Sequence, residues 1–233
     1  MIIVPRLMKY TPLIPLEGKT LKVYLKPMRK YMAENKKYTF AIDCDEVLRA
    51  LLGNMVSLYN DAFGENLKYD DVKEFKVEHS FPKIQEVTGT SASQWFFQEH
   101  SEELFAKSGA FPGIKQDIET LQKYGEVIIV TYQKSYRNKI DTLNWLEEHG
   151  LVPDGICFVK DKSLIHTDFL IDDNDYNFIG CNAETGILIT APYNRDIAVD
   201  ELHEKGNCKW MYRYDSIHDF VVDFVEKEEN TQF

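Results

Sequence analysis

Two carboxylates, Asp43 and Asp45, directly follow the β-prone run Tyr38-Thr39-Phe40-Ala41-Ile42. Burying an unpaired charge costs free energy, so two acids at the end of a buried strand indicate a functional role for these side chains. Open α/β folds bind ligands at the carboxyl edge of a parallel sheet. There, two carboxylates can hold a hard cation such as Mg²⁺, and one of them can act as a nucleophile and form an aspartyl-phosphate. The alternative interpretation is a strand followed by a solvated acidic turn.

Polar groups also follow three further predicted strands. Thr131 follows the strand at 126–130, Lys160 and Lys162 follow the strand at 155–159, and Asp172 with Asp173 follows the strand at 169–171. Because the carboxyl ends of parallel strands share one edge, all these groups can converge with the first two acids. Carboxylates that hold a metal, and a hydroxyl and an ammonium that bind phosphate oxygens, are the parts that phosphoryl transfer requires.

The elements that must position these groups follow from the hydrophobic pattern. From residue 111 onward, predicted strands alternate with helices at 114–124, 138–149 and 216–227, which indicates a parallel α/β sheet. Further strands are expected at 187–190 and, at a sheet edge, 209–214.

Residues 49–108 contain no convincing buried strand, and helices at 48–63, 82–87 and 91–105 predict a small helical unit inserted after the first strand. Aromatic residues crowd this insert, and most of them are expected to form its core, while one or two could face a cleft and stack on a ring. They are Phe75, Phe81, Trp95, Phe96 and Phe97.

Residues 1–37 form an extension with an alternating strand-like stretch at 19–25, and no chemistry is visible in it. It either packs on the main domain or serves as a partner-binding arm.

Composition limits the classes of function. The 233 residues are 44% hydrophobic and 28% charged, as in ordinary globular proteins, and the net charge of −11 argues against binding duplex nucleic acid. No apolar run reaches the roughly 18–20 residues of a membrane span, and the amino terminus does not resemble a secretory signal. Four scattered cysteines without metal-ligand spacing predict reduced core thiols and a cytoplasmic protein.

Taken in order, Asp43-Cys44-Asp45-Glu46-Val47, Thr131, Lys162 and Asp172-Asp173 resemble the four motifs of the haloacid dehalogenase-like (HAD) phosphatases. The stretch 160–173 and the sequence Ala191-Pro192-Tyr193-Asn194-Arg195 are similar to the 5'(3')-deoxyribonucleotidase group, the 5'-nucleotidases of type C. The resemblance implies a Rossmann-like parallel sheet, the HAD core, at 38–48 and 109–233, with a small α-helical cap at 49–108.

The resemblance also implies the roles of the acids. Asp43 would be the nucleophile, and Asp45 the general acid and then the base that activates water. Mg²⁺ would be held by Asp43, the main-chain carbonyl of Asp45 and the pair Asp172-Asp173. Dehalogenases of this superfamily lack an acid at the position of Asp45, so its presence here favours phosphate ester hydrolysis.

For the substrate, the resemblance implies that Thr131 and Lys162 hold the phosphate, with Lys160 as a weaker candidate. Trp95 and Phe96 are predicted to stack on the nucleotide base. We therefore expect a Mg²⁺-dependent phosphatase of small nucleoside monophosphates, with deoxynucleotides preferred. The alternatives are a HAD phosphatase of another small phosphomonoester and a non-catalytic nucleotide-binding protein, and the sequence leaves open whether the protein forms a homodimer.

Two departures from the group border the predicted substrate site. Glu46 stands where the group usually has Gly, and Tyr132-Gln133 stand where it tends to have a small residue and Pro. They affect the expected substrate more than the expected chemistry.

Overall fold

A computed structural model describes residues 37–231, and the strand-like stretch expected at 19–25 lies outside this range. Its centre is a six-stranded sheet with the order β3-β2-β1-β4-β5-β6, in which every pairing is parallel. The strands are β1 (Tyr38–Ile42), β2 (Gly125–Thr131), β3 (Gly155–Phe158), β4 (His166–Asp172), β5 (Asn182–Ile189) and β6 (Trp210–Tyr214). The predicted α/β fold and the predicted edge strand are confirmed.

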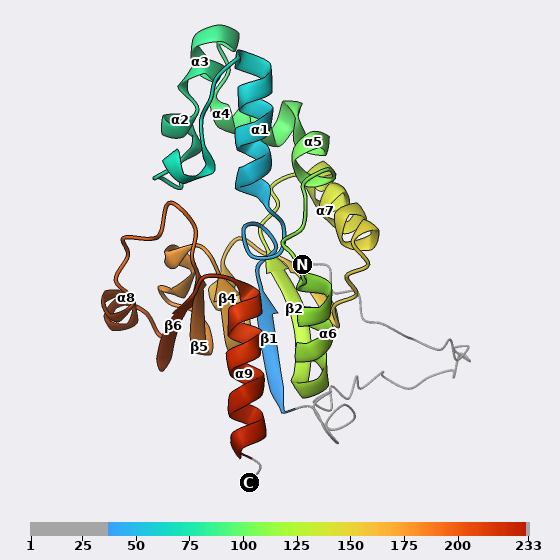
Figure 1. Ribbon diagram of the computed structural model, residues 1–233, viewed down its shortest axis with the longest axis vertical. Helices are drawn as coiled ribbons and strands as arrows, with labels where there is room; N and C mark the ends of the chain where they lie inside the picture. Colours follow the sequence, from blue (N-terminus) through green and yellow to red (C-terminus); the bar gives the residue numbers. More distant parts are fainter. Residues whose placement is uncertain (1–36, 232–233) are drawn as a thin grey trace, which may run out of the picture.

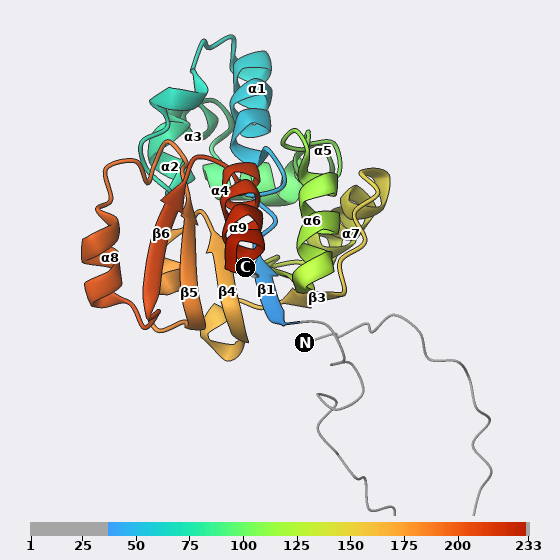
Figure 2. The same cartoon turned by 60° about the horizontal axis from the view of Figure 1, so that its bottom comes forward.

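Alternating side chains bury both faces of this sheet. On β1, Phe40 and Ile42 join one apolar cluster with residues of α6 (Ile114–Tyr124), α7 (Tyr136–Glu148) and α9 (Ile217–Thr231). Ala41 points to the opposite cluster, which includes residues of η5 (Asp175–Phe178) and α8 (Val199–Lys205). Figure 1 shows α6 and α9 in front of the strands, and Figure 2 shows α8 beside β6 at one edge of the sheet.

Apart from the short η4 (Lys162–Leu164), the remaining helices form a group beyond the carboxyl edge of the sheet (Figure 1), which we call the helical unit. Its elements are α1 (Leu51–Phe63), η2 (Tyr69–Asp71), α2 (Val77–Ser80), α3 (Pro82–Thr88), α4 (Ala92–Gln94), η3 (Trp95–Glu99) and α5 (Ser101–Phe105). The unit has an apolar cluster of its own. Two chain segments join it to the sheet and bond to each other, through Ala50 N to Gly109 O and Phe111 N to Leu48 O. The domain limits at 48 and 109 stay a prediction.

Two local features differ from the sequence expectations. Helix α1 begins at Leu51 rather than at 48, because a tight loop precedes it: the main-chain nitrogens of Leu48 and Arg49 both donate to Cys44 O. Helix α8 was not predicted, and Leu202 is its one buried residue, so it lacks the apolar repeat that marks a helix.

All four cysteines are free and buried, as predicted for reduced core thiols. The fold also brings the Sγ atoms of Cys181 and Cys208 to 2.8 Å from each other, which their spacing in the sequence did not indicate. Among residues 37–231, no helix combines the length and the apolar character that crossing a membrane requires.

Candidate active site

The motif residues meet at the carboxyl edge of the sheet. The ladder between β1 and β4 continues through Asp43 N, which donates to Ile171 O, so Asp43 lies beside the end of β4. One carboxylate oxygen from each of Asp43, Asp172 and Asp173 lies within 4.8 Å of the other two. Lys162 Nζ is 3.1 Å from Asp43 Oδ1 and 2.5 Å from Asp172 Oδ2. We call these four buried residues the acid cluster.

The acid cluster contains three carboxyl groups but one ammonium group, so its negative charges are not fully balanced. Burial raises the pKa of Asp43 to about 7; the negative charges of Asp172 and Asp45 add to this effect, whereas Lys162 opposes it. The pKa of Asp173 is also raised well above its usual range, by burial and by the negative charges of Asp172 and Asp43. Burial disfavours the Lys162 charge, but Asp172 and Asp43 outweigh it and raise the pKa of the ammonium. Three acids share one cation.

The cluster therefore fits a divalent cation. Asp43 Oδ1 is buried and accepts no hydrogen bond from any described residue, although the Lys162 ammonium is near. A buried oxygen without a donor, beside further carboxylate oxygens, is the environment that a hard cation such as Mg²⁺ prefers.

Asp172 and Asp173 differ in how much of their carboxylate is already engaged. Asp172 accepts hydrogen bonds from Lys162 Nζ, from Asn174 N and, on both oxygens, from Asn177 Nδ2. The Asp173 carboxylate accepts a hydrogen bond from the Tyr193 hydroxyl. Asp173 is thus the acid of the pair with more capacity left for a metal ion.

Asp45 lies in separate surroundings. Arg49 Nε and Nη2 are 2.7 and 2.6 Å from Asp45 Oδ1, and Gln133 Nε2 donates to Asp45 Oδ2 over 2.9 Å. Its side chain is 22% exposed, which leaves it accessible from the edge. Sequence reasoning missed both partners, since an arginine before a helix and a glutamine after a strand carry no signal that they face an acid.

The two other predicted phosphate ligands differ in placement. Thr131 ends β2 and is buried at the same edge. Lys160 follows β3 and is exposed, whereas Lys162 is buried. Phosphate binding by these side chains stays a prediction.

The aromatic rings of the helical unit divide into core and rim. Trp95 and Phe96 are buried, with ring centroids 5.0 Å apart, and Phe96 lies 4.9 Å from Phe81. Phe75 is 59% exposed and contacts Tyr193 edge-on at 5.4 Å, next to the hydroxyl that bonds Asp173. This placement favours a core role for Trp95 and Phe96, whose predicted contact with a base stays a prediction, and it makes Phe75 an exposed ring of the helical unit that adjoins the site.

Glu46 links the helical unit to the edge of the sheet. Its carboxylate accepts hydrogen bonds from Leu52 N, at the start of α1, and from the Tyr69 hydroxyl, over 2.7 and 2.8 Å. Burial raises its pKa to about 7. Its φ of 57° lies in the left-handed region that glycine adopts freely, so the Gly that the sequence resemblance leads us to expect here would fit this backbone.

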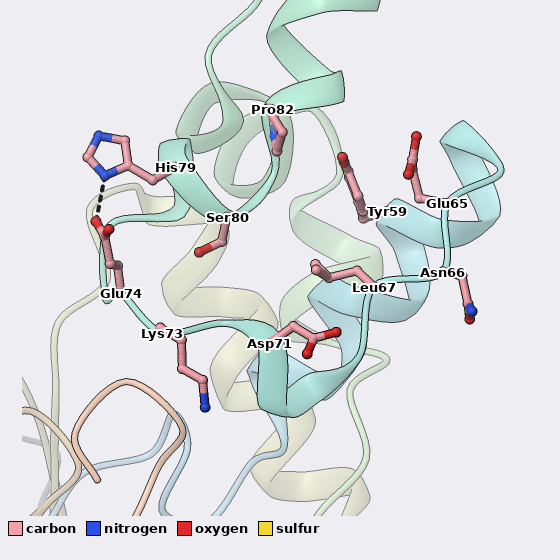
Figure 3. Close-up of a pocket in the computed structure, with 10 residues that line it drawn as sticks. All are labelled: Tyr59, Glu65, Asn66, Leu67, Asp71, Lys73, Glu74, His79, Ser80 and Pro82. Atoms are coloured by element: carbon pink, nitrogen blue, oxygen red, sulfur yellow. Dashed lines mark hydrogen bonds and ion pairs between the residues drawn. The ribbon is translucent and has the colours of Figure 1, made fainter. Parts of the chain in front are cut away.

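A separate hollow of about 600 Å³ lies within the helical unit (Figure 3). Its lining mixes acidic, basic and neutral side chains and includes no member of the acid cluster. The lining residues are Tyr59, Glu65, Asn66, Leu67, Asp71, Lys73, Glu74, His79, Ser80 and Pro82. The motif residues predicted from the sequence are therefore at the sheet edge and not in this hollow.

Comparison with protein families agrees with the geometry of the edge. Residues 37–217 match the family described as "5' nucleotidase, deoxy (Pyrimidine), cytosolic type C protein". A 5'(3')-deoxyribonucleotidase of Clostridium acetobutylicum is 27% identical over 161 residues, which are 68% of this chain and 85% of that protein. A 5'(3')-deoxyribonucleotidase of Bacillus subtilis is 27% identical over 163 residues, covering 69% of this chain and 89% of the relative.

Solved structures show the same fold. A haloacid dehalogenase-like family hydrolase from Streptococcus pneumoniae superposes with a TM-score of 0.52 at 15% identity, covering 80% of this chain and 98% of that one. A protein described as a haloacid dehalogenase-like hydrolase from Burkholderia xenovorans superposes with a TM-score of 0.51 at 14% identity, covering 81% of this chain and 96% of that one.

Proposed function

The chain belongs to the family of cytosolic type C 5' nucleotidases, and from this premise we propose that it is a Mg²⁺-dependent phosphatase of (deoxy)ribonucleoside monophosphates. The products would be a nucleoside and phosphate. One observation carries the proposal: Lys162 contacts both Asp43 and Asp172 at the edge where Asp173 completes a set of three acids.

Asp43, Asp173 and the main-chain carbonyl of Asp45 would hold the Mg²⁺ ion. When bound, the ion supplies positive charge that offsets the repulsion between a carboxylate nucleophile and an anionic phosphate. Asp172 would act through Lys162 and Asn177 rather than on the metal, because its oxygens already accept hydrogen bonds from both.

In the first step, a carboxylate oxygen of Asp43 attacks phosphorus and the bond from phosphorus to the nucleoside oxygen breaks. The electron pair of that bond stays on the nucleoside oxygen, which takes a proton from Asp45. Thr131 and Lys162 bind the phosphate oxygens during this transfer, and the raised pKa of Lys162 keeps its ammonium charged. The intermediate is an aspartyl-phosphate on Asp43.

In the second step, Asp45 takes a proton from water as the water oxygen attacks phosphorus. The bond between phosphorus and Asp43 breaks, its electrons restore the carboxylate, and inorganic phosphate leaves. One residue thus serves as acid and then as base, so the enzyme returns to its starting protonation state.

The helical unit, at 49–108, would serve as a cap over the nucleoside. Its contacts with the edge support this: Asp70 Oδ1 lies 2.7 Å from Arg195 Nη2, and Phe75 touches Tyr193. An exposed ring beside the acid cluster can stack on a base, because every base has a π-face.

The test is a hydrolysis panel of deoxy- and ribonucleoside 5'- and 3'-monophosphates with other small phosphomonoesters. We expect nucleotides to be the better substrates, EDTA to stop turnover and added Mg²⁺ to restore it. Preference for another phosphomonoester would remove the nucleotide assignment, and turnover in EDTA would contradict the metal site.

A further inference from the structure

Arg49 is completely buried at the junction between the sheet and the helical unit, with 0% of its side chain exposed. It belongs to one of the two connecting segments, and its backbone forms a bridge with Ala110 in the other. A buried guanidinium is costly unless its donors are satisfied and its charge is paired. Its partners therefore indicate why it is there.

The Arg49 guanidinium has partners in three parts of the molecule: helix α5, helix α7 and the loop after β1 that carries Asp45. Nη1 donates to Phe105 O of α5 over 2.7 Å, and Nη2 lies 3.2 Å from Thr142 Oγ1 of α7. Its central carbon lies 5.0 and 5.2 Å from the ring centroids of Phe105 and Trp145. The carboxylate that it meets is Asp45, through two nitrogens on the same oxygen, Oδ1.

The two oxygens of Asp45 are thus not equivalent. Oδ1 faces two donors of a guanidinium, a group that keeps its protons, so Oδ1 has no room for a proton of its own. Oδ2 faces the side-chain amide of Gln133, at 2.9 Å. An amide can donate to a carboxylate oxygen and, after rotation, accept from a protonated one, so Gln133 can satisfy Oδ2 in both states.

We propose that Arg49 is a positioning residue for Asp45, which it holds by Oδ1 so that Oδ2 is the oxygen that exchanges the proton. Oδ2 gives its proton to the nucleoside oxygen as the bond to phosphorus breaks, and takes one from water in the second step. This inference rests on the proposed function and names the residue that makes its acid and base usable. Arg49 itself touches neither substrate nor metal.

A purely structural link between α5 and α7 would not need a carboxylate of the site. Such a link exists on the surface, where Arg137 Nη2 lies 2.7 Å from Glu102 of α5 and Nε donates to Asp141 of α7 over 3.0 Å. Arg137 is 59% exposed and does not contact Asp45. It therefore provides a matched control for the contact that Arg49 makes.

The experiment compares two leaving groups. A nucleoside alkoxide needs a proton to depart, whereas p-nitrophenolate is stable without one, so only the first depends on a placed acid. In single-turnover measurements of leaving-group release, which follow the first step alone, Arg49→Met should lower the rate about a hundredfold on the best nucleotide but only about threefold on p-nitrophenyl phosphate. Arg49→Lys, which keeps a buried cation and protects folding, should show the same selectivity because it lacks the fork of two donors.

Asp45→Asn is the reference for a lost acid and should show the same selectivity, while Arg137→Met should leave both rates unchanged. Equal losses on both substrates in the Arg49 variants, or unchanged rates, would overturn the inference while leaving the proposed function in place. A wild-type protein that hydrolyses neither substrate, or an Asp45→Asn variant without the selectivity, would instead remove the function on which it rests.

Discussion

The carboxyl edge of the sheet and the helical unit beyond it are built from opposite kinds of residue. At the edge, buried charged groups contact one another, as Lys162 does with Asp43 and Asp172. In the helical unit, the buried set from α1 to α5 is apolar apart from Ser101, and the Tyr69 hydroxyl is one of the polar groups that meet the edge. Burying apolar surface stabilises a fold, whereas burying charge costs free energy and is kept where chemistry needs it. Substitutions at the edge should therefore affect turnover, and substitutions in the unit should affect stability.

The largest effect is expected at Asp43. Asp43→Asn keeps the shape of the side chain but removes the nucleophile, so turnover should vanish while the thermal unfolding temperature is kept or raised, because a buried negative charge is lost. Phosphate release and a melting curve on the same sample measure both quantities. A variant that retains turnover would show that Asp43 is not the nucleophile.

A second pair of variants separates two acids of the same edge. Asp173→Asn should raise the Mg²⁺ concentration needed for half-maximal activity by at least about tenfold, because a ligand is lost. Asp172→Asn should leave that concentration nearly unchanged and lower kcat, because Lys162 loses its partner at 2.5 Å. Equal shifts in the Mg²⁺ titration for the two variants would mean that both acids bind the ion.

The helical unit offers the opposite test with two phenylalanines. Phe96→Ala removes a fully buried ring and should cost about 3–5 kcal/mol of unfolding free energy. Phe75→Ala, at an exposed ring, should keep stability and raise KM for nucleotides about tenfold, with little change for p-nitrophenyl phosphate. A selective rise in KM for Trp95→Ala or Phe96→Ala at unchanged stability would instead assign the base contact to the buried rings.

Glu46, at the boundary, should give the smallest effect. Its pKa in the folded protein is raised to about 7 by burial, above its value of 4.5 in an unfolded chain. The folded state therefore holds the proton more tightly, and stability is lost as the pH rises from about 4.5 through about 7. Glu46→Gln should remove this loss, which is at most about 3 kcal/mol.

Urea unfolding of the wild type and of Glu46→Gln at pH 5 and pH 8 measures that loss. We expect the free energy of unfolding of the variant, relative to that of the wild type, to be higher at pH 8 than at pH 5. If the difference in unfolding free energy between the two proteins is the same at both pH values, Glu46 keeps an ordinary pKa in the folded state.

The sheet could be predicted closely because its signals are local. Runs such as 126–130 bury both faces and end on a polar residue, and β2 was found at Gly125–Thr131. The helical unit was harder, since its short elements leave little periodicity to read: Ser91 to Phe105 is divided among α4, η3 and α5. The start of α1 was placed too early because a loop closed on Cys44 O looks like a helical turn in sequence.

The candidate site divides in the same way. Asp43, Thr131, Lys162 and the pair Asp172-Asp173 were visible in the sequence because each follows a strand. The partners of Asp45 were not visible: Gln133 is 88 residues away along the chain, and the Thr142 hydroxyl that helps to hold Arg49 is 93 residues from it.

By itself, the sequence determined which side chains stand at the ends of parallel strands, because strand periodicity and strand ends are properties of neighbouring residues. The tertiary structure alone decided how those side chains are used. In the folded protein Asp43 contacts a lysine, Asp45 contacts an arginine and Glu46 accepts a hydrogen bond from a tyrosine, although the three acids lie within four consecutive residues. The physical reason is that burial and most of the partners, such as Lys162, Gln133 and Tyr69, come from other segments of the chain, and these set the charge and orientation of each carboxylate.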